Sequence, residues 1–269
     1  MIKHSFCLLN GLGAKTEKRL WETGVLTWDD FLERDTVPFF GRDRKALYDE
    51  ELRTFYKGLK EKNEGVFLRD VRKDEHWRFF EEFKNDAVCL DIETNGLMHG
   101  SGGYVTMVGL YDGSHYKCLI KGGSAATSEC DNLTEENLLK NLSGYKYLIT
   151  FYGSVFDIPF LKKNFPGLAF NMLHYDICLA SRKVGIRGGL KKIEKAFGIS
   201  RVDEVDGLTG FDAVRLWHNH LEGRGSSLDT LIKYNRADTV NLMALGEIVF
   251  DELRRATGIE SYLRAGGRN

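Results

Sequence analysis

The hydrophobic and polar positions of this chain change their pattern near residue 66. Before that point, apolar residues are interspersed with charged ones, as they are in amphipathic helices. After it, apolar residues gather into short runs such as "AVCLDIE" (87–93), which are typical of buried strands. The pattern therefore predicts a helical N-terminal part followed by a larger α/β part.

The N-terminal part contains clear start and stop signals for helices. Residues 6–32 predict two helices around a glycine turn, the second of which begins near Ala14 and ends at Gly24. A further helix is expected to begin after Thr27. Asp30 follows three residues later and is expected to complete a capping box with it.

The part after residue 66 predicts a mixed sheet flanked by helices. Asp112-Gly113 is a strong hairpin signal between two strand-like segments. Helices at 134–142 and 156–165 alternate with the later strands, and several more helices follow. Three hairpin-type strands followed by alternating helix and strand indicate an α/β fold. The predicted strands lie at 87–93, 104–111, 115–121, 145–152 and 172–176.

These patterns divide the chain into four predicted parts. Residues 1–35 form a small all-α module, and residues 36–65 form a helical connector that includes a charged helix. Residues 66–256 form the α/β domain, and residues 257–269 are expected to be a flexible tail. A length of 269 residues is enough for one large domain with its own core and a small additional module.

Charge and cysteine content narrow the classes of function. The formal net charge of −1 provides no global basic field, so an anionic partner would be held by local patches or by metal ions. No apolar run is long enough for a signal peptide or a membrane span. An odd number of cysteines without CxxC spacing predicts neither a disulfide framework nor a zinc site, and it favours the reducing cytoplasm. The five cysteines are Cys7, Cys89, Cys118, Cys130 and Cys178.

Acidic residues recur at positions where they could converge. Asp91 and Glu93 lie two apart at the end of a predicted strand, so both side chains project to one face of the sheet. Asp157 follows a later strand, and Asp238 lies on a late helix. Tyr234 precedes Asp238 by four residues and shares its helix face. Four carboxylates from three segments, together with a phenol, are therefore candidates for one site.

This arrangement resembles the DEDD exonucleases of the Tyr subtype, which have a ribonuclease-H-like fold. Asp-x-Glu on the first strand, Asp157 after a Phe-Asp step, and Tyr-x-x-x-Asp on a late helix match the three motifs of that superfamily. The chain is most similar to its YprB-like branch, from about residue 86 to 250. The similarity extends to "HYDICLASRKV", "GGLKKIEKAFGI", "DGLTGFDAVRLW" and "YNRADTVNL".

The resemblance implies residue roles that agree with the chemistry of hard cations. Asp91, Glu93, Asp157 and Asp238 would bind two divalent ions, Mg²⁺ or Mn²⁺, which prefer oxygen ligands. Tyr234 would orient the attacking water. The implied activity is 3′→5′ hydrolysis of phosphodiester bonds with release of nucleoside monophosphates.

A second resemblance concerns the N-terminal module. "LNGLGAKTEKRLWETGV" looks like a helix-hairpin-helix motif, in which backbone amides of the turn and the next helix contact a phosphate. Gly11 and Gly13 would form the hairpin, and Lys15 and Lys18 would add positive charge. The alternative is an ordinary turn between helices. Because such motifs are commoner on DNA, the resemblance favours DNA over RNA.

Other candidate nucleic-acid contacts lie in the larger domain. Tyr152 stands where related sequences often have Asn, and it could stack on a base. Arg187 and Lys191 belong to a basic segment that is either a phosphate-binding patch or a solvated helix face. Asp176 reads best as a helix N-cap.

We therefore predict an exonuclease that acts on single-stranded DNA or frayed 3′ ends. An RNA 3′ exonuclease with the same site is one alternative, and a non-catalytic nucleic-acid-binding module is another. Any replication or repair role would require a partner protein, since no polymerase or helicase motif is present.

Overall fold

The fold is built around a mixed sheet whose strands follow the order β4-β3-β2-β1-β5-β6. The computed structural model describes residues 1–98, 100–122 and 130–266. β1, β2 and β3 are antiparallel neighbours, whereas β5 and β6 continue the sheet in parallel on the other side of β1. The predicted α/β class is therefore confirmed. The strands are β1 (Ala87–Thr94), β2 (Val105–Tyr111), β3 (Tyr116–Ile120), β4 (Cys130–Asn132), β5 (Tyr147–Thr150) and β6 (Leu173–Asp176).

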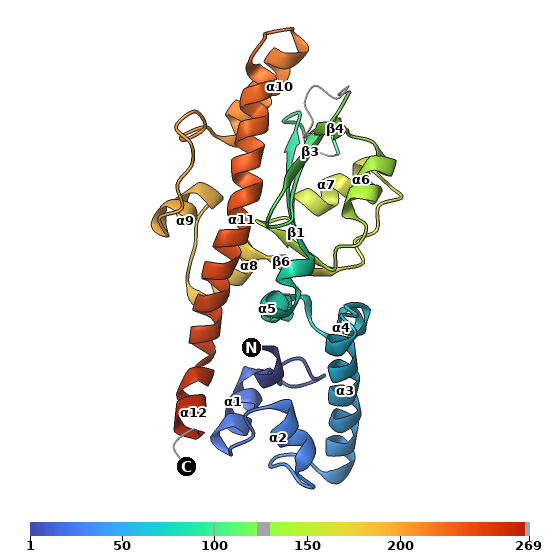
Figure 1. The fold of residues 1–269 in the computed structure, drawn as a ribbon, viewed down its shortest axis with the longest axis vertical. Coiled ribbons are helices and arrows are strands. Elements are labelled where there is room, and N and C mark those ends of the chain that lie inside the picture. Colours follow the sequence, from blue (N-terminus) through green and yellow to red (C-terminus); the bar gives the residue numbers. More distant parts are fainter. Residues whose placement is uncertain (99, 123–129, 267–269) are drawn as a thin grey trace.

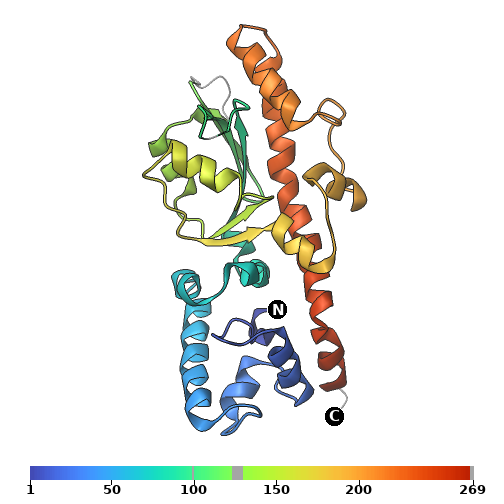
Figure 2. The same ribbon diagram turned by 180° about the vertical axis from the view of Figure 1, so that it is seen from behind.

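Helices cover both faces of this sheet (Figures 1 and 2). One face packs against α6 (Glu135–Leu142) and α7 (Asp157–Asn164). The other packs against α11 (Ser227–Thr257), a helix of 31 residues that crosses β1 and β2. The smaller helices beside α11 are α8 (Ile177–Ser181), η4 (Arg182–Val184), α9 (Leu190–Ala196) and α10 (Gly210–Leu221).

Strand β1 shows why its acids face α11. Val88, Leu90 and Ile92 belong to the apolar cluster on the α6 and α7 side. Side chains alternate along a strand, so Asp91 and Glu93 point to the opposite face. That face is covered by α11, which packs directly on β1.

Gly109 of β2 allows α11 to approach the sheet closely. A Cβ atom at this position would overlap Asn235 Oδ1 and Thr239 Oγ1, two buried polar atoms of α11. The absence of a side chain at residue 109 therefore sets the distance between the helix and β2.

Gly109→Ala is expected to lower the free energy of unfolding by about 1–3 kcal/mol, because the added methyl group overpacks this contact. Urea denaturation measures the change. Gly225→Ala is the matched control, since a Cβ there has no neighbour within 4 Å. Equal stability of the two variants would contradict the proposed close approach.

The N-terminal part differs from its prediction before Ala14. Residues 5–13 form successive turns, so the first helix of the expected pair is absent. The amides of Phe6 and Cys7 instead donate to the buried carboxylate of Glu17, at 2.7 and 2.9 Å. The amides that follow form only single turns, from Leu9 to the carbonyl of Phe6 and from Leu12 to that of Leu9. The N-terminal elements are η1 (Ile2–His4), α1 (Ala14–Glu22), α2 (Trp28–Glu33), α3 (Arg42–Lys60) and α4 (Gly65–Asp70).

Other N-terminal signals are confirmed. α1 begins at Ala14, and Gly24 follows its end with a positive φ of 77°. Thr27 and Asp30 form the capping box at the start of α2.

The N-terminal helices share a core with the sheet. One continuous apolar cluster contains Trp28 of α2, Phe55 of α3, Cys89 of β1 and Leu242 of α11. A segment of short helices joins the two parts. These helices are η2 (Lys73–Phe79), α5 (Phe80–Phe83) and η3 (Lys84–Asp86).

The expected flexible tail is wrong for most of its length. Residues Ile259–Gly266 form α12, and the last three residues lie outside the described part. α12 packs on α1, where the rings of Trp21 and Tyr262 lie 5.8 Å apart. Among the described residues, no helix has the length and apolar character needed to cross a membrane.

The cysteine prediction requires a correction. Cys118 of β3 and Cys130 of β4 form a disulfide, whereas the odd count and the spacing predicted none. The two residues face each other in the parallel pairing of β3 with β4. No strand was predicted at β4, so the register that pairs Cys118 with Cys130 could not be predicted either. The cysteine pattern therefore no longer supports the predicted cytoplasmic location.

Candidate active site

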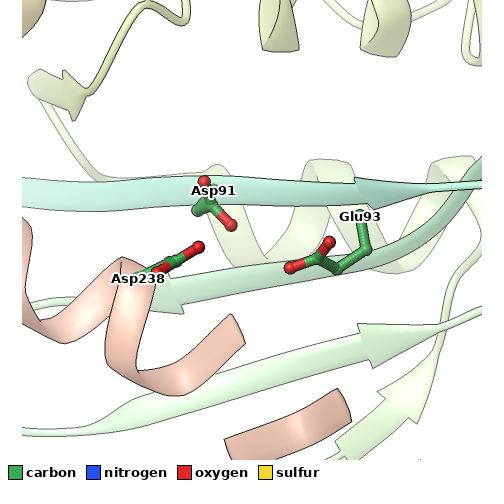
Figure 3. A group of neighbouring side chains, drawn as sticks. All are labelled: Asp91, Glu93 and Asp238. Carbon is green, nitrogen blue, oxygen red and sulfur yellow. The ribbon is translucent and has the colours of Figure 1, made fainter. Parts of the chain in front are cut away.

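Three carboxylates converge between the sheet and α11. Asp91 and Glu93 come from β1, and Asp238 comes from α11 (Figure 3). One oxygen atom of each lies within 4.8 Å of the others. The strand period places the first two on one face, and the packing of α11 brings the third. The structure thus brings together three of the four predicted acids.

Asp157 adjoins this cluster through the backbone of β1. Its Oδ1 accepts a hydrogen bond of 3.1 Å from the amide of Ile92, which lies between Asp91 and Glu93 in sequence. Asp157 is the first residue of α7, which follows β5. β5 pairs with β1 only as far as Cys89, so the amide of Ile92 is free to bind Asp157. Burial is the main cause of the raised pKa values of Asp91 and Glu93, and the charge of Asp157 adds a smaller contribution to both.

The acids of the cluster are close enough to repel one another, and Arg201 and Lys191 offset this repulsion only in part. Burial, followed by repulsion from Asp238, raises the pKa of Asp91 and of Glu93 well above their usual values. Burial raises the pKa of Asp157 to about 7. Buried carboxylates that repel one another are suited to a hard divalent cation, which relieves the repulsion and takes oxygen ligands. The donor set therefore fits Mg²⁺ or Mn²⁺.

Asn235 orients the first acid, and the sequence analysis did not single it out. Its Nδ2 donates to Asp91 Oδ2 at 2.9 Å, and its Oδ1 accepts from the Tyr116 hydroxyl at 2.9 Å. Asn235 is fully buried on α11, between Leu231 and Leu242. The sequence does contain a signal for Asn235, because an amide on the apolar face of a helix is buried and needs a hydrogen-bond partner.

Tyr234 lies one helical turn before Asp238 and is almost fully buried. Burial, followed by repulsion from Asp238 and Glu93, raises the pKa of its hydroxyl, so the phenol stays protonated. Lys191 Nζ lies 2.9 Å from the hydroxyl oxygen and 4.2 Å from the ring centre. An ammonium group only donates, so the Tyr234 oxygen is the acceptor.

Lys191 therefore lies at the acidic cluster rather than on a solvated helix face. It also donates to the carbonyl of Leu208. Burial lowers its pKa, whereas the charges of Asp238 and Glu93 act in the opposite direction.

A second cation, Arg201, reaches the cluster, and it was not predicted from the sequence. Arg201 donates to Asp238 and pairs with the buried Glu194. A lone Arg in a loop between two helices carries no local signal of such a contact.

The remaining predicted nucleic-acid contacts are exposed. Tyr152 has a positive φ of 66°, and the guanidinium of Arg182 lies 5.6 Å from its ring centre. Arg187 is exposed in the loop before α9. Lys15 and Lys18 are exposed on α1.

The glycine turn is present without its expected first helix. Gly11 has a positive φ of 80°, and Gly13 is the N-cap of α1. The amide of Asn10 donates to Glu51 at 3.3 Å, so one amide of the turn already has a carboxylate partner.

Asp176 is confirmed as an N-cap, here of α8. It accepts from the amide of Leu179 at 3.2 Å. It also accepts from the amides of Tyr152 and Ser154, at 3.0 and 2.9 Å. The single carboxylate therefore ties the loop before Asp157 to the end of β6.

Residues 88–250 match the RNase H superfamily. The family B DNA polymerase from the hyperthermophilic archaeon Pyrobaculum calidifontis is 14% identical, with a TM-score of 0.46 over 61% of this chain and 24% of the polymerase. A structure described as the apo form of the nuclease is 21% identical, with a TM-score of 0.44 over 69% of this chain and 81% of the nuclease. The chain thus spans about a quarter of the polymerase's length. No curated protein matches the sequence.

Proposed function

This chain belongs to the RNase H superfamily, and we propose that it is a metal-dependent 3′→5′ exonuclease that releases nucleoside monophosphates. The observation that carries the proposal is the buried cluster of Asp91, Glu93 and Asp238, with Tyr234 one turn away. A solvated sheet edge would not bury Glu93 and Asp238 beside a half-buried Asp91 that repels both.

The acids are proposed to hold the metal. Asp91, Glu93, Asp238 and the adjoining Asp157 would bind two divalent ions, Mg²⁺ or Mn²⁺. Such ions activate a water molecule and stabilise the leaving oxygen of a phosphodiester. Asn235 holds Asp91 by its amide, so this carboxylate keeps one orientation before and during the reaction.

Tyr234 is proposed to orient the attacking water. Its raised pKa makes it a hydrogen-bonding group rather than a base at neutral pH. Lys191 occupies one lone pair of the hydroxyl oxygen, which leaves the second lone pair for the water. The same lysine brings positive charge to the place where the phosphate would sit.

Exposed apolar side chains after the end of β1 and at the start of α10 would suit an unpaired 3′ end. Leu97 and Met98 follow β1 and are 51% and 67% exposed, and Phe211 at the start of α10 is 80% exposed. Gly96 lies against Val214, one helical turn from Phe211. Exposed apolar and aromatic side chains of this kind can stack on bases. Tyr152, beneath Arg182, would offer a further stacking surface.

The proposed substrate class follows from exposed basic residues and the glycine turn. Arg187, Lys15, Lys18 and the Gly11–Gly13 turn would contact phosphates without reading sequence. We propose single-stranded DNA or frayed DNA ends, because the glycine turn resembles a motif that is commoner on DNA. RNA is the alternative substrate.

The test is a time course on oligonucleotides labelled at the 3′ or the 5′ end. DNA and RNA, single- and double-stranded, are each incubated with Mg²⁺, Mn²⁺ or EDTA. The expected result is a ladder of 5′-labelled products that shortens from the 3′ end and is absent with EDTA. Faster cleavage of RNA would overturn the substrate assignment. Binding without cleavage in every metal condition would support a non-catalytic module instead.

A further inference from the structure

We propose that Arg201 is a positioning residue that fixes the carboxylate of Asp238 for metal binding. The inference rests on the proposed function, because it assigns a role toward the same metal site. Arg201 lies in the loop that follows α9, outside the three acidic motifs. Its side chain is only 3% exposed, although it carries a full charge.

Arg201 belongs to a closed ring of buried polar contacts. Its Nη1 donates to Asp238 Oδ1. On the other side of the guanidinium, Nε donates to Glu194 Oε2 at 2.7 Å, and Nη2 lies 2.6 Å from the same oxygen. Glu194 Oε1 accepts from Asn241 Nδ2 at 3.0 Å. Asn241 is three residues after Asp238 on α11, so the ring begins and ends on one helix.

The ring restricts the rotation of the Asp238 side chain. A terminal carboxylate turns easily about its last bond when nothing holds it. Here the planar guanidinium is held by Glu194, and it in turn holds one oxygen of Asp238. The carboxylate is directed toward Asp91 and Glu93 (Figure 3). Groups that orient a metal ligand in this way typically change metal affinity by 10–100-fold when removed.

The charge of Arg201 does not compete with a metal ion for Asp238, because Glu194 offsets it. Glu194 is 2% exposed and lies against Arg201, so its negative charge offsets the positive charge of the guanidinium. The pair together adds no net charge to the cluster. Asp238 therefore keeps its own negative charge for a cation.

The test measures binding of Mn²⁺ alone by isothermal titration calorimetry, without nucleic acid. Arg201→Lys keeps the charge but loses the planar fork that reaches both carboxylates. Glu194→Gln removes the charge that holds the fork. Both variants are expected to raise the Kd for Mn²⁺ by roughly 10–100-fold.

Arg255→Lys is the matched control. Arg255 lies on α11, as Asp238 does, and it pairs with Glu252 at 2.8 Å on the surface of the protein. Its Kd should equal that of the wild type. Circular dichroism and thermal melting in EDTA report whether each variant is folded. If Arg201→Lys and Glu194→Gln do not fold, Asn241→Ala breaks only the outermost bond of the ring and should weaken Mn²⁺ binding by a smaller factor.

Folded ring variants with an unchanged Kd would overturn the inference. Tighter binding would also overturn it, since that is the result expected if Arg201 competes with the ion. If the wild type binds Mn²⁺, Asp91→Asn does not, and the ring variants bind normally, only this inference fails. If the wild type binds no Mn²⁺, the proposed function fails together with it.

Discussion

Asp91→Asn is expected to lower the rate of the proposed exonuclease reaction by roughly a thousandfold or more while the protein stays folded. Bound metal supplies several kcal/mol of transition-state stabilisation, and each 1.36 kcal/mol corresponds to about a factor of ten in rate. Asparagine has nearly the shape of aspartate and can still accept from Asn235, but it is neutral and a poor ligand for a hard cation.

The metal-free fold of Asp91→Asn should be at least as stable as that of the wild type. Burial and the repulsion from Asp238 and Glu93 raise the pKa of Asp91, so its charge opposes folding at neutral pH. Thermal melting in EDTA measures this. The rate is measured on a 5′-labelled oligonucleotide with Mg²⁺.

The control is Asp131→Asn, the same substitution at an exposed ion pair with Lys117 on the sheet edge. It should retain the wild-type rate. Full activity of Asp91→Asn would remove this residue from the proposed site. A melting temperature far below that of the wild type would indicate a structural role instead.

The stabilisation that Mn²⁺ confers is expected to increase steeply as the pH rises from about 5 to 8. Burial raises the folded-state pKa of Asp157 to about 7, from an ordinary value of 3.8, and it raises those of Asp91 and Glu93 as well. The folded protein therefore holds protons on these groups that the unfolded chain has already released. Without metal, this contribution to the free energy of unfolding is present at low pH and is lost as the pH rises through the folded-state pKa values.

Metal binding requires the deprotonated carboxylates, so ion and proton compete for the same groups. At a pH high enough to deprotonate the carboxylates, Mn²⁺ at a hundred times its Kd should add about 2.7 kcal/mol to the free energy of unfolding. The measurement is the difference in melting temperature between Mn²⁺ and EDTA at each pH.

The difference between the melting temperatures in Mn²⁺ and in EDTA cancels the effects of other titrating groups on stability. Burial lowers the pKa of His76 and of His174 to about 4, so these two residues destabilise the fold at acidic pH whether or not metal is present. Asp91→Asn should abolish most of the Mn²⁺ effect at every pH. A stabilisation by Mn²⁺ that does not depend on pH would contradict binding at the buried acids.

Features that depend on neighbouring residues could be predicted from the sequence. The alternation of β1 placed Asp91 and Glu93 on one face, because successive side chains of a strand point in opposite directions. Thr27 and Asp30 formed the expected cap, because both partners lie within one turn.

Features that depend on distant partners could not be predicted in this way. Residues before Ala14 looked helical, but Glu17 takes up their amides, and Glu17 is itself held by Arg78, 61 residues away. The disulfide of Cys118 with Cys130 depends on the register of two strands, one of which had too short a segment to be recognised. α12 forms where a tail was expected because Tyr262 packs against Trp21, at the other end of the chain.

The same division holds for the candidate site. The sequence by itself determined that Asp91 and Glu93 share a strand face and that Tyr234 shares a helix face with Asp238, because strand and helix periods decide the direction in which each side chain points. Only the tertiary structure decided what holds them. Asn235 meets Asp91 across 144 residues, Lys191 meets Tyr234 across 43, and Arg201 meets Asp238 across 37. These contacts arise because α11 packs against β1 and α9 packs against α11, and the charges buried there require partners that local spacing does not specify.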